Sequence, residues 1–353
     1  MGQDEVPTTK QLDFETHIEL KQIGPVSHSP TIHILLGNQM GLQKHSTLLP
    51  SYYLPQATSL ITRVFPQDTF TSIHQPWLFH ITFTVPGPLM MAEAASTAYK
   101  TVPDGFMLDT LQTHFMLAPD SKKPLVYKVQ RLSQGRRFAV RLVNIEQDDG
   151  RICVTITTSF MSGASWTGRA MTHAESMRTT QRIRDITLDD FEENRSHLGP
   201  FMKFERLPHV QHVPPDPSTT IAPVVAKIDP PIKAPTGSLL HLLGMIYLSD
   251  YHVMDCPLTI HGVDSGLFAI GDHTRNRPSS GSMMKIMTSL NHTVHFHAHD
   301  GFRADELVYI EATSPWAKDG RALIHSKMFS HNGLLIATCV QEAFYVFKDA
   351  AKL

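Results

Sequence analysis

The sequence is poor in cysteine, and this scarcity excludes two classes of architecture. Only three of its 353 residues are cysteines, Cys153, Cys256 and Cys339, and no two of them form a CxxC pair. A sparse, odd set of widely spaced thiols is typical of a reducing compartment and argues against a disulfide framework or a zinc ribbon. With 41% hydrophobic residues, the chain is long enough for one large core or two ordinary domains.

Long apolar runs and an excess of charge of one sign are also missing. No apolar run approaches the roughly 18 residues that a membrane span needs, and the first ten residues lack the apolar centre of a secretory signal. The 31 basic and 33 acidic residues give a formal net charge of −2, so the chain has no general attraction to nucleic acid or anionic membranes. We therefore expect no membrane span and no nucleic-acid partner.

The chain closes on Ala351-Lys352-Leu353. Peroxisomal import is read from a C-terminal Ser-Lys-Leu, and a small residue is accepted in the first place. This tripeptide predicts a peroxisomal matrix protein that is recognised by an import receptor. The alternative is an ordinary polar tail on a cytoplasmic protein.

The sequence repeats itself at a nearly constant interval. Leu-Val-Tyr occurs at 125–127 and again at 307–309, a shift of 182 residues, and a Gly-Arg pair follows each copy. Each copy then contains a turn, Asp149-Gly150 in the first and Asn332-Gly333 in the second, and these pairs favour hairpins because they tolerate positive φ. Alternating apolar residues around the turns predict three antiparallel strands in each copy.

A helix is predicted before each set of strands. The first covers 88–102, with Pro88 in the first turn and Pro103 as a stop signal. The second covers 238–251, with Ser238 as the N-cap. The second helix is apolar nearly all round, and a helix without a polar face belongs in an interior.

A sheet wrapped round one buried helix, made twice, is a tandem hotdog, an α+β fold. We assign residues 1–165 to the N-terminal hotdog unit, 166–200 to a polar linker with some helix, and 201–353 to the C-terminal unit. Within the proline-rich start of the second unit, the runs 209–213 and 220–228 are predicted to be its opening strands.

Four histidines lie close together in the segment "SLNHTVHFHAHDGFRADE": His292, His295, His297 and His299. On a strand, the last three would share one face and His292 would point to the other. An HxHxH array is able to bind a metal ion, but no carboxylate stands at a recognisable spacing. We expect a polar strand beside a site, and no metal.

Several blocks, in the right order, resemble the type II acyl-CoA thioesterases, and most closely the peroxisomal branch of that double-hotdog family. They are "YLSDYHVMDCPLTIHG", "SLNHTVHFHAHDGFRADE", "SPWAKDGRA" and "VQEAF", together with the region around "KPLVYKVQRL". The resemblance covers roughly Thr69 to the C-terminus, and the first 65 or so residues match poorly.

The resemblance implies hydrolysis of an acyl-CoA by a water molecule that three side chains hold. They are Asp250 of the Ser-Asp pair, Ser289 three residues before a histidine, and Gln341 of the Val-Gln-Glu segment. The chemistry is reasonable, because a thioester is already activated and requires no covalent nucleophile. A carboxylate base is worth about 10²–10⁴ in rate, and a hydroxyl and an amide fix the water and the developing charge. No cofactor and no metal are implied, since CoA is part of the substrate.

Substrate-binding positions follow less directly. Gly87 is what remains of a Phe-Gly-Gly-Gln block that usually opens the first helix, which here reads "VPGPLMM" over 85–91. Together with His292 and Arg303, it is expected to contact the substrate. The altered block indicates a reshaped pocket, and an acyl-CoA of specialised metabolism is one alternative substrate.

Two other classes of function stay open at this point. Hotdog folds also serve as hydratases and dehydratases that pair a histidine with an acid, and a chain of this kind could bind acyl-CoA without reacting. Release of free thiol distinguishes hydrolysis from both. Whether the chain forms a homo-oligomer is also open.

Overall fold

The computed structural model describes residues 13–24, 68–74, 76, 85–147, 150–163, 169–178, 201–211, 214–250, 253–263 and 284–347. The C-terminal tripeptide 351–353 lies outside these residues, so peroxisomal import stays a prediction. Within the described ranges, no helix combines the length and the apolar character that crossing a membrane requires.

The described chain contains two similar sets of elements. The first set comprises α1 (Phe14–His17), β1 (Leu20–Gln22), β2 (Asp68–Ser72), α2 (Gly87–Tyr99), β3 (Phe106–Phe115), β4 (Val126–Gln134), β5 (Phe138–Glu146) and β6 (Ile152–Ser162). The second set comprises β7 (Met202–Arg206), β8 (Ile221–Ile228), α4 (Leu239–Asp250), α5 (Asp255–Ile260), β9 (Met284–Phe296), β10 (Val308–Lys318), β11 (Arg321–Ser330) and β12 (Leu335–Phe347).

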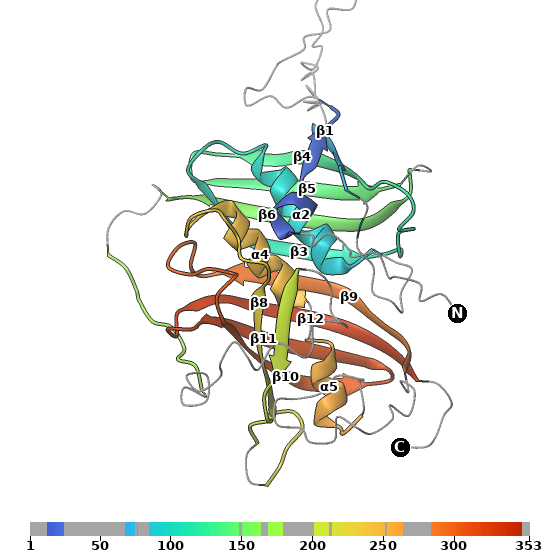
Figure 1. The fold of residues 1–353 in the computed structure, drawn as a ribbon, viewed down its shortest axis with the longest axis vertical. Coiled ribbons are helices and arrows are strands. Elements are labelled where there is room, and N and C mark those ends of the chain that lie inside the picture. The colour runs from blue at the N-terminus through green and yellow to red at the C-terminus, as the bar shows by residue number, and fades with distance from the viewer. Residues whose placement is uncertain are drawn as a thin grey trace, which may run out of the picture.

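The strands form one twelve-stranded antiparallel sheet in the order β1-β2-β4-β5-β6-β3-β9-β12-β11-β10-β8-β7. The order is symmetric about the β3–β9 junction, where Thr110 pairs with His295 and His114 with Asn291. Figure 1 shows the N-terminal half above this junction and the C-terminal half below it. The predicted repeat is confirmed, because β4 begins at 126 and β10 at 308, a shift of 182 residues. Two hotdog units thus join edge to edge into a single sheet.

The two long helices α2 and α4 are enclosed by this sheet and contact one another. Residues 88–98 of α2 and 241–250 of α4 are buried, as expected for helices without a polar face. The predicted boundaries, 88–102 and 238–251, differ from the observed ones by at most three residues. A single hydrophobic cluster contains residues of both helices and both halves of the sheet, so the units share one core.

The short N-terminal segment 13–22 is anchored on α4. The ring of Phe14 is 1% exposed and packs edge-on against Tyr247 at 5.5 Å between centroids. Glu15 Oε1 accepts hydrogen bonds from the backbone N–H groups of Lys233 (2.8 Å) and Ala234 (3.1 Å), just before α4 begins. This region resembles the family poorly, yet it braces the helix that ends in Asp250.

The region between the repeats differs from the sequence-based expectation. Of the run 209–213, the described residues 209–211 form no strand, and among them only Val210 makes an isolated bridge, to Ile221. The prolines at 214, 215 and 217 follow directly, and proline has no N–H to extend a ladder. The outermost strand is instead β7, which pairs with β8, whereas the predicted strand at 220–228 is confirmed. In the linker, the described residues 169–178 contain no helix.

A carboxyl group is buried in the middle of α2. Glu93 is 1% exposed and accepts hydrogen bonds from the Tyr127 hydroxyl and from Ser72 Oγ (3.2 Å). Burial raises its pKa from 4.5 to about 7, although these hydrogen bonds act in the opposite direction. An acid whose pKa is higher in the folded state binds its proton more tightly there, so ionisation favours the unfolded chain.

We therefore expect the contribution of Glu93 to the free energy of unfolding to fall as pH rises from 4.5 to about 7 and then to level off, whereas buried histidines with a lowered pKa, such as His292, act in the opposite direction over this range. Glu93 alone contributes about 3 kcal/mol to this fall. Asp250, whose pKa is also raised to about 7, contributes in the same direction. Because the other groups are common to both proteins, urea denaturation should show the free energy of unfolding of the wild type, relative to that of Glu93→Gln, falling by about 3 kcal/mol between pH 5 and pH 8. If the difference in unfolding free energy between the two proteins were the same at pH 5 and pH 8, the raised pKa of Glu93 would be contradicted.

Candidate active site

Three polar side chains from separate elements meet inside the C-terminal half. Gln341 Nε2 donates to Asp250 Oδ1 (2.5 Å) and to Ser289 Oγ (2.6 Å), and Ser289 Oγ donates to Asp250 Oδ1 (3.3 Å). All three are buried. Asp250 ends α4, Ser289 lies on β9 and Gln341 lies on β12. The structure therefore brings together the three residues that the sequence singled out, although Asp250 and Gln341 are 91 positions apart.

A bulge in β9 directs Ser289 toward the helices. Glu342 pairs with Asn291, but the next residue of β12, Ala343, pairs with Ser289, so β9 contains one extra residue at Leu290. Side chains alternate along a regular strand, which would place positions 289 and 292 on opposite faces. The extra residue shifts the alternation, so Ser289 and His292 are both buried.

The surroundings of Asp250 favour a carboxyl group that titrates near neutrality. Burial raises its pKa to about 7, and the hydrogen bonds from Gln341 and Ser289 oppose this rise. Both hydrogen bonds reach Oδ1. Oδ2 points instead toward the start of α2, where a Cβ atom built on Gly87 would lie only 2.7 Å from it. An acid at the C-terminal end of its own helix is unfavourable, and the positive end of α2 offsets this effect.

Gly87, the remnant of the altered block, therefore lies directly at the site. It follows the N-cap Pro86 and begins α2, and Phe115 contacts the same position (3.1 Å from a Cβ built on Gly87). Pro88 has no N–H group, so the donors in the first turn are the backbone N–H groups of Gly87 and Leu89. Such groups at a helix start can stabilise a negatively charged oxygen.

His292 lies behind the three polar residues. It is fully buried, pairs directly with Gln341 across β9 and β12, and its Nε2 is 3.0 Å from Ser249 Oγ. Burial lowers its pKa to about 3, so the ring is neutral at physiological pH. The structure places this ring in the core, where it is 0% exposed.

The other histidines lie on the outer side, and part of their predicted arrangement is wrong. His295 is exposed, opposite in direction to His292, as expected. However, β9 ends at Phe296, so His297 and His299 do not continue the strand. His297 Nε2 lies 3.0 Å from Thr338 Oγ1, and His299 Nε2 lies 2.6 Å from Leu108 O. Among the described residues, no three His, Cys, Asp or Glu side chains gather as a metal site would require.

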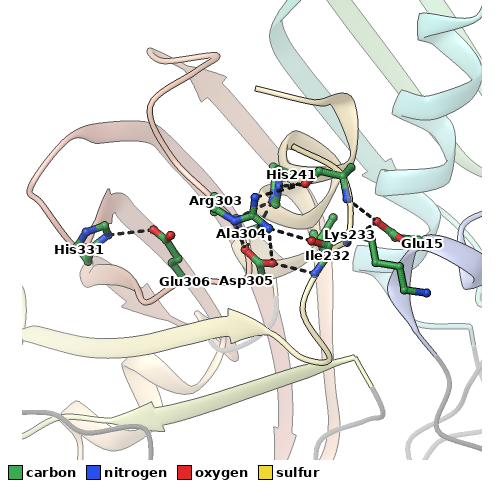
Figure 2. Close-up of polar contacts among 10 residues, drawn as sticks. Glu15, Ile232, Lys233, His241, Arg303, Ala304, Asp305, Glu306 and His331 are labelled. Carbon is green, nitrogen blue, oxygen red and sulfur yellow. Dashed lines mark hydrogen bonds and ion pairs between the residues drawn. The ribbon is translucent and has the colours of Figure 1, made fainter. Parts of the chain in front are cut away.

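Arg303, also expected to contact the substrate, lies near the end of α4 opposite Asp250. Its guanidinium donates twice to Asp305 (2.9 and 2.8 Å) and once to Ile232 O (2.8 Å), and Figure 2 shows it enclosed by these groups. The adjacent Ala304 N–H donates to His241 in the first turn of α4. His241 and Asp250 are nine residues apart on α4, roughly 14 Å along the axis. Asp305, two residues later, holds the Arg303 guanidinium. Arg303 thus belongs to the contacts that brace the first turn of α4, at the opposite end from Asp250.

Sequence reasoning missed two residues that complete the site. Met254 Sδ is 3.3 Å from Ser289 Oγ, and the Met254 carbonyl accepts a hydrogen bond from Tyr345 (2.7 Å). Ser249 connects α4 to His292. Ser249 could have been found, because it belongs to the Ser-Asp pair that identified Asp250. Met254 could not have been found from the sequence, since an apolar residue after a helix normally indicates core packing.

Comparison with protein families finds matches in both halves of the chain. Residues 74–161 match the model of an acyl-CoA thioesterase N-terminal domain, and residues 188–345 match that of an acyl-CoA thioesterase C-terminal domain. Acyl-coenzyme A thioesterase 8 of Mus musculus is 26% identical over 274 residues, covering 72% of this chain and 78% of that protein. Acyl-CoA thioesterase 2 of Haemophilus influenzae is 24% identical over 274 residues, covering 74% and 88%.

Solved structures share the fold. The acyl-CoA thioesterase II TesB2 of Mycobacterium marinum superposes with a TM-score of 0.58 at 21% identity, covering 81% of this chain and 94% of that one. A hot dog fold protein of unknown function from Alicyclobacillus acidocaldarius gives 0.57 at 15% identity, covering 80% and 94%. The tandem hotdog architecture is therefore confirmed.

The close approach of Asp250 to α2 leads to a testable expectation for Gly87. In Gly87→Ala, the new methyl group would lie 2.7 Å from Asp250 Oδ2 and displace the carboxylate. Thioester hydrolysis should fall on the order of 10- to 100-fold, because small displacements of reacting groups are costly. Gly163→Ala is the matched control, since its methyl group would meet the flexible end of Met107 at 3.3 Å and lie at an ordinary contact distance, 3.7 Å, from Gly105 O. Equal rates for the two variants, measured as thiol release, would contradict this geometry.

Proposed function

The chain belongs to the acyl-CoA thioesterase family and hydrolyses acyl-CoA thioesters, and on that premise we propose that Asp250 is the general base that activates the attacking water. One observation carries the proposal: a buried carboxyl group with a pKa of about 7 receives both of its hydrogen bonds on Oδ1. Among the described residues, nothing hydrogen-bonds Oδ2. This oxygen is left to accept a proton.

In the proposed reaction, the water lies against Asp250 Oδ2, within reach of the Ser289 hydroxyl. Oδ2 takes a proton from the water as its oxygen bonds to the thioester carbon. The N–H groups of Gly87 and Leu89 stabilise the carbonyl oxygen as it becomes negative. The intermediate then breaks its carbon–sulfur bond, and the departing CoA thiolate takes the proton from Asp250. The products are a free acid and CoA, and neither a cofactor nor a metal takes part.

Gln341 has a different task in this scheme. Its two Nε2 hydrogens hold Asp250 Oδ1 and Ser289 Oγ in one fixed arrangement. Fixing the base and the hydroxyl before the substrate arrives removes entropy that the transition state would otherwise have to lose. A single amide therefore determines the geometry of the other two residues.

The alternatives find less support in these contacts. A hydratase of this fold pairs a histidine with an acid, whereas His292 contacts Ser249 and Gln341 rather than Asp250. A thiol nucleophile is disfavoured at Cys339, because burial raises its pKa to about 12. A protein that only binds acyl-CoA does not require a carboxyl group poised to titrate near pH 7.

We expect Asp250→Asn to reduce kcat by about 10²-fold or more with little change in substrate affinity, because the amide keeps the shape but cannot accept the proton. Ser289→Ala and Gln341→Ala should also lower kcat more than they raise KM. The base acts only when ionised, so the rate of the wild-type protein should rise with pH through about 7 and then reach a plateau.

Thiol release from a panel of fatty acyl-CoAs, measured from pH 5 to pH 9, tests these expectations together. Glu93→Gln is the control, since Glu93 has a similarly raised pKa but contacts Tyr127 and Ser72 instead of this site. If Asp250→Asn released CoA as fast as the wild-type protein, Asp250 would not be the base.

A further inference from the structure

We propose that His292 is a positioning residue for the thioesterase reaction: it holds the Gln341 amide in the orientation that presents Nε2 to Asp250 and Ser289. This proposal rests on the function proposed above and assigns His292 a role through Gln341, without contact with the substrate. It differs from the substrate-binding role that the sequence indicated.

The orientation of the Gln341 amide is decisive for the site. Its nitrogen has two hydrogens, and both are used, one toward Asp250 Oδ1 and one toward Ser289 Oγ. Rotating the amide by 180° would exchange its ends and place Oε1 against a carboxylate. Two acceptors would then face one another, and Ser289 would lose its donor. Something must therefore hold the oxygen end of this amide.

His292 is the polar residue directly opposite. It pairs with Gln341 in the register of β9 and β12, so both side chains lie on the same, helix-facing side. Gln341 favours the protonated form of the ring, in opposition to burial. Since Nε2 of Gln341 is directed at Asp250 and Ser289, the oxygen is the end of the amide that is left for the imidazole. Gln341 Oε1 and His292 Nδ1 are both buried, and neither has a hydrogen-bond partner among the described residues; the proposed role pairs these two atoms with each other.

The imidazole is itself anchored to the helix that carries the base. Its Nε2 lies 3.0 Å from Ser249 Oγ, which is also 2.8 Å from Ile246 O within α4. A neutral imidazole carries one N–H group, so for Nδ1 to donate to Gln341 Oε1 the Ser249 hydroxyl donates to Nε2 rather than to Ile246 O. Ser249 immediately precedes Asp250. The chain of contacts Ser249–His292–Gln341 therefore runs behind the site and returns to Asp250, closing a ring of buried polar groups around the base.

A double-mutant cycle tests this role. His292→Leu should lower kcat on the order of tenfold with KM changed less than about twofold, because the substrate does not touch the ring. In the Gln341→Ala background the same substitution should change kcat by less than about twofold, because the amide it positions is gone. His292→Asn keeps a donor close to the place of Nδ1 and should restore most of the activity.

His295→Leu is the matched control, a substitution on the same strand whose side chain is exposed on the outer face. It should leave kcat unchanged. Melting temperatures of all variants separate loss of folding from loss of positioning. If His292→Leu does not fold, the cycle is completed with His292→Asn and His292→Gln, in which only the donor near the place of Nδ1 should support full activity.

Two results would overturn the proposal. One is a kcat for His292→Leu equal to that of the wild-type protein. The other is an equal loss from His292→Leu in both backgrounds, which would show that the ring acts independently of Gln341. Should Gln341→Ala itself leave kcat unchanged, the proposed function of the three residues would fail, and this outcome is distinct from the other two.

Discussion

The structure depends on one unfavourable burial, that of the Asp250 carboxyl group between two helices. It lies at the end of α4, where the dipole of its own helix opposes a negative charge, and it is 4% exposed. The start of α2, reached across the contact between the two units, offsets that opposition. Glycine at position 87 makes the approach feasible, because any side chain would collide with Oδ2. The same burial that costs stability gives the carboxyl group a pKa near neutrality.

Two matching hotdog units make only one such site, and the sheet register shows how. The bulge that directs Ser289 inward has a counterpart in β3, where the register also shifts between Leu108 and Thr110. Phe160 pairs with Leu108 there, as Ala343 pairs with Ser289. The positions that correspond to Ser289 and Gln341 thus carry Leu108 and Thr158, so the N-terminal unit supplies a helix start and a core in place of a second set of polar groups.

The sequence allowed the architecture to be predicted because the repeat, the hairpin glycines and the apolar helix at 238–251 all indicate the same fold. The family resemblance located Asp250, Ser289 and Gln341, but it did not predict their contacts, which depend on a bulge at Leu290 that no local pattern announces. Arg303 shows a similar limit: a basic residue near a strand end looks the same in the sequence whether it binds a phosphate or an acid two positions away, and here it pairs with Asp305. For His292, the sequence predicted a contact with the substrate, and only the register of β9 against β12 and the burial of the ring show that it faces Gln341 rather than solvent.

The central claim, that Asp250 activates water and does not itself attack the thioester, is tested most directly by the origin of the oxygen in the product. A single turnover is run in H₂¹⁸O with protein in excess of a fatty acyl-CoA, and the released acid is analysed by mass spectrometry. The account predicts that the acid carries one ¹⁸O atom after this first turnover. Unlabelled acid, with ¹⁸O appearing instead in the peptide that contains Asp250, would show a covalent acyl-aspartate and contradict it.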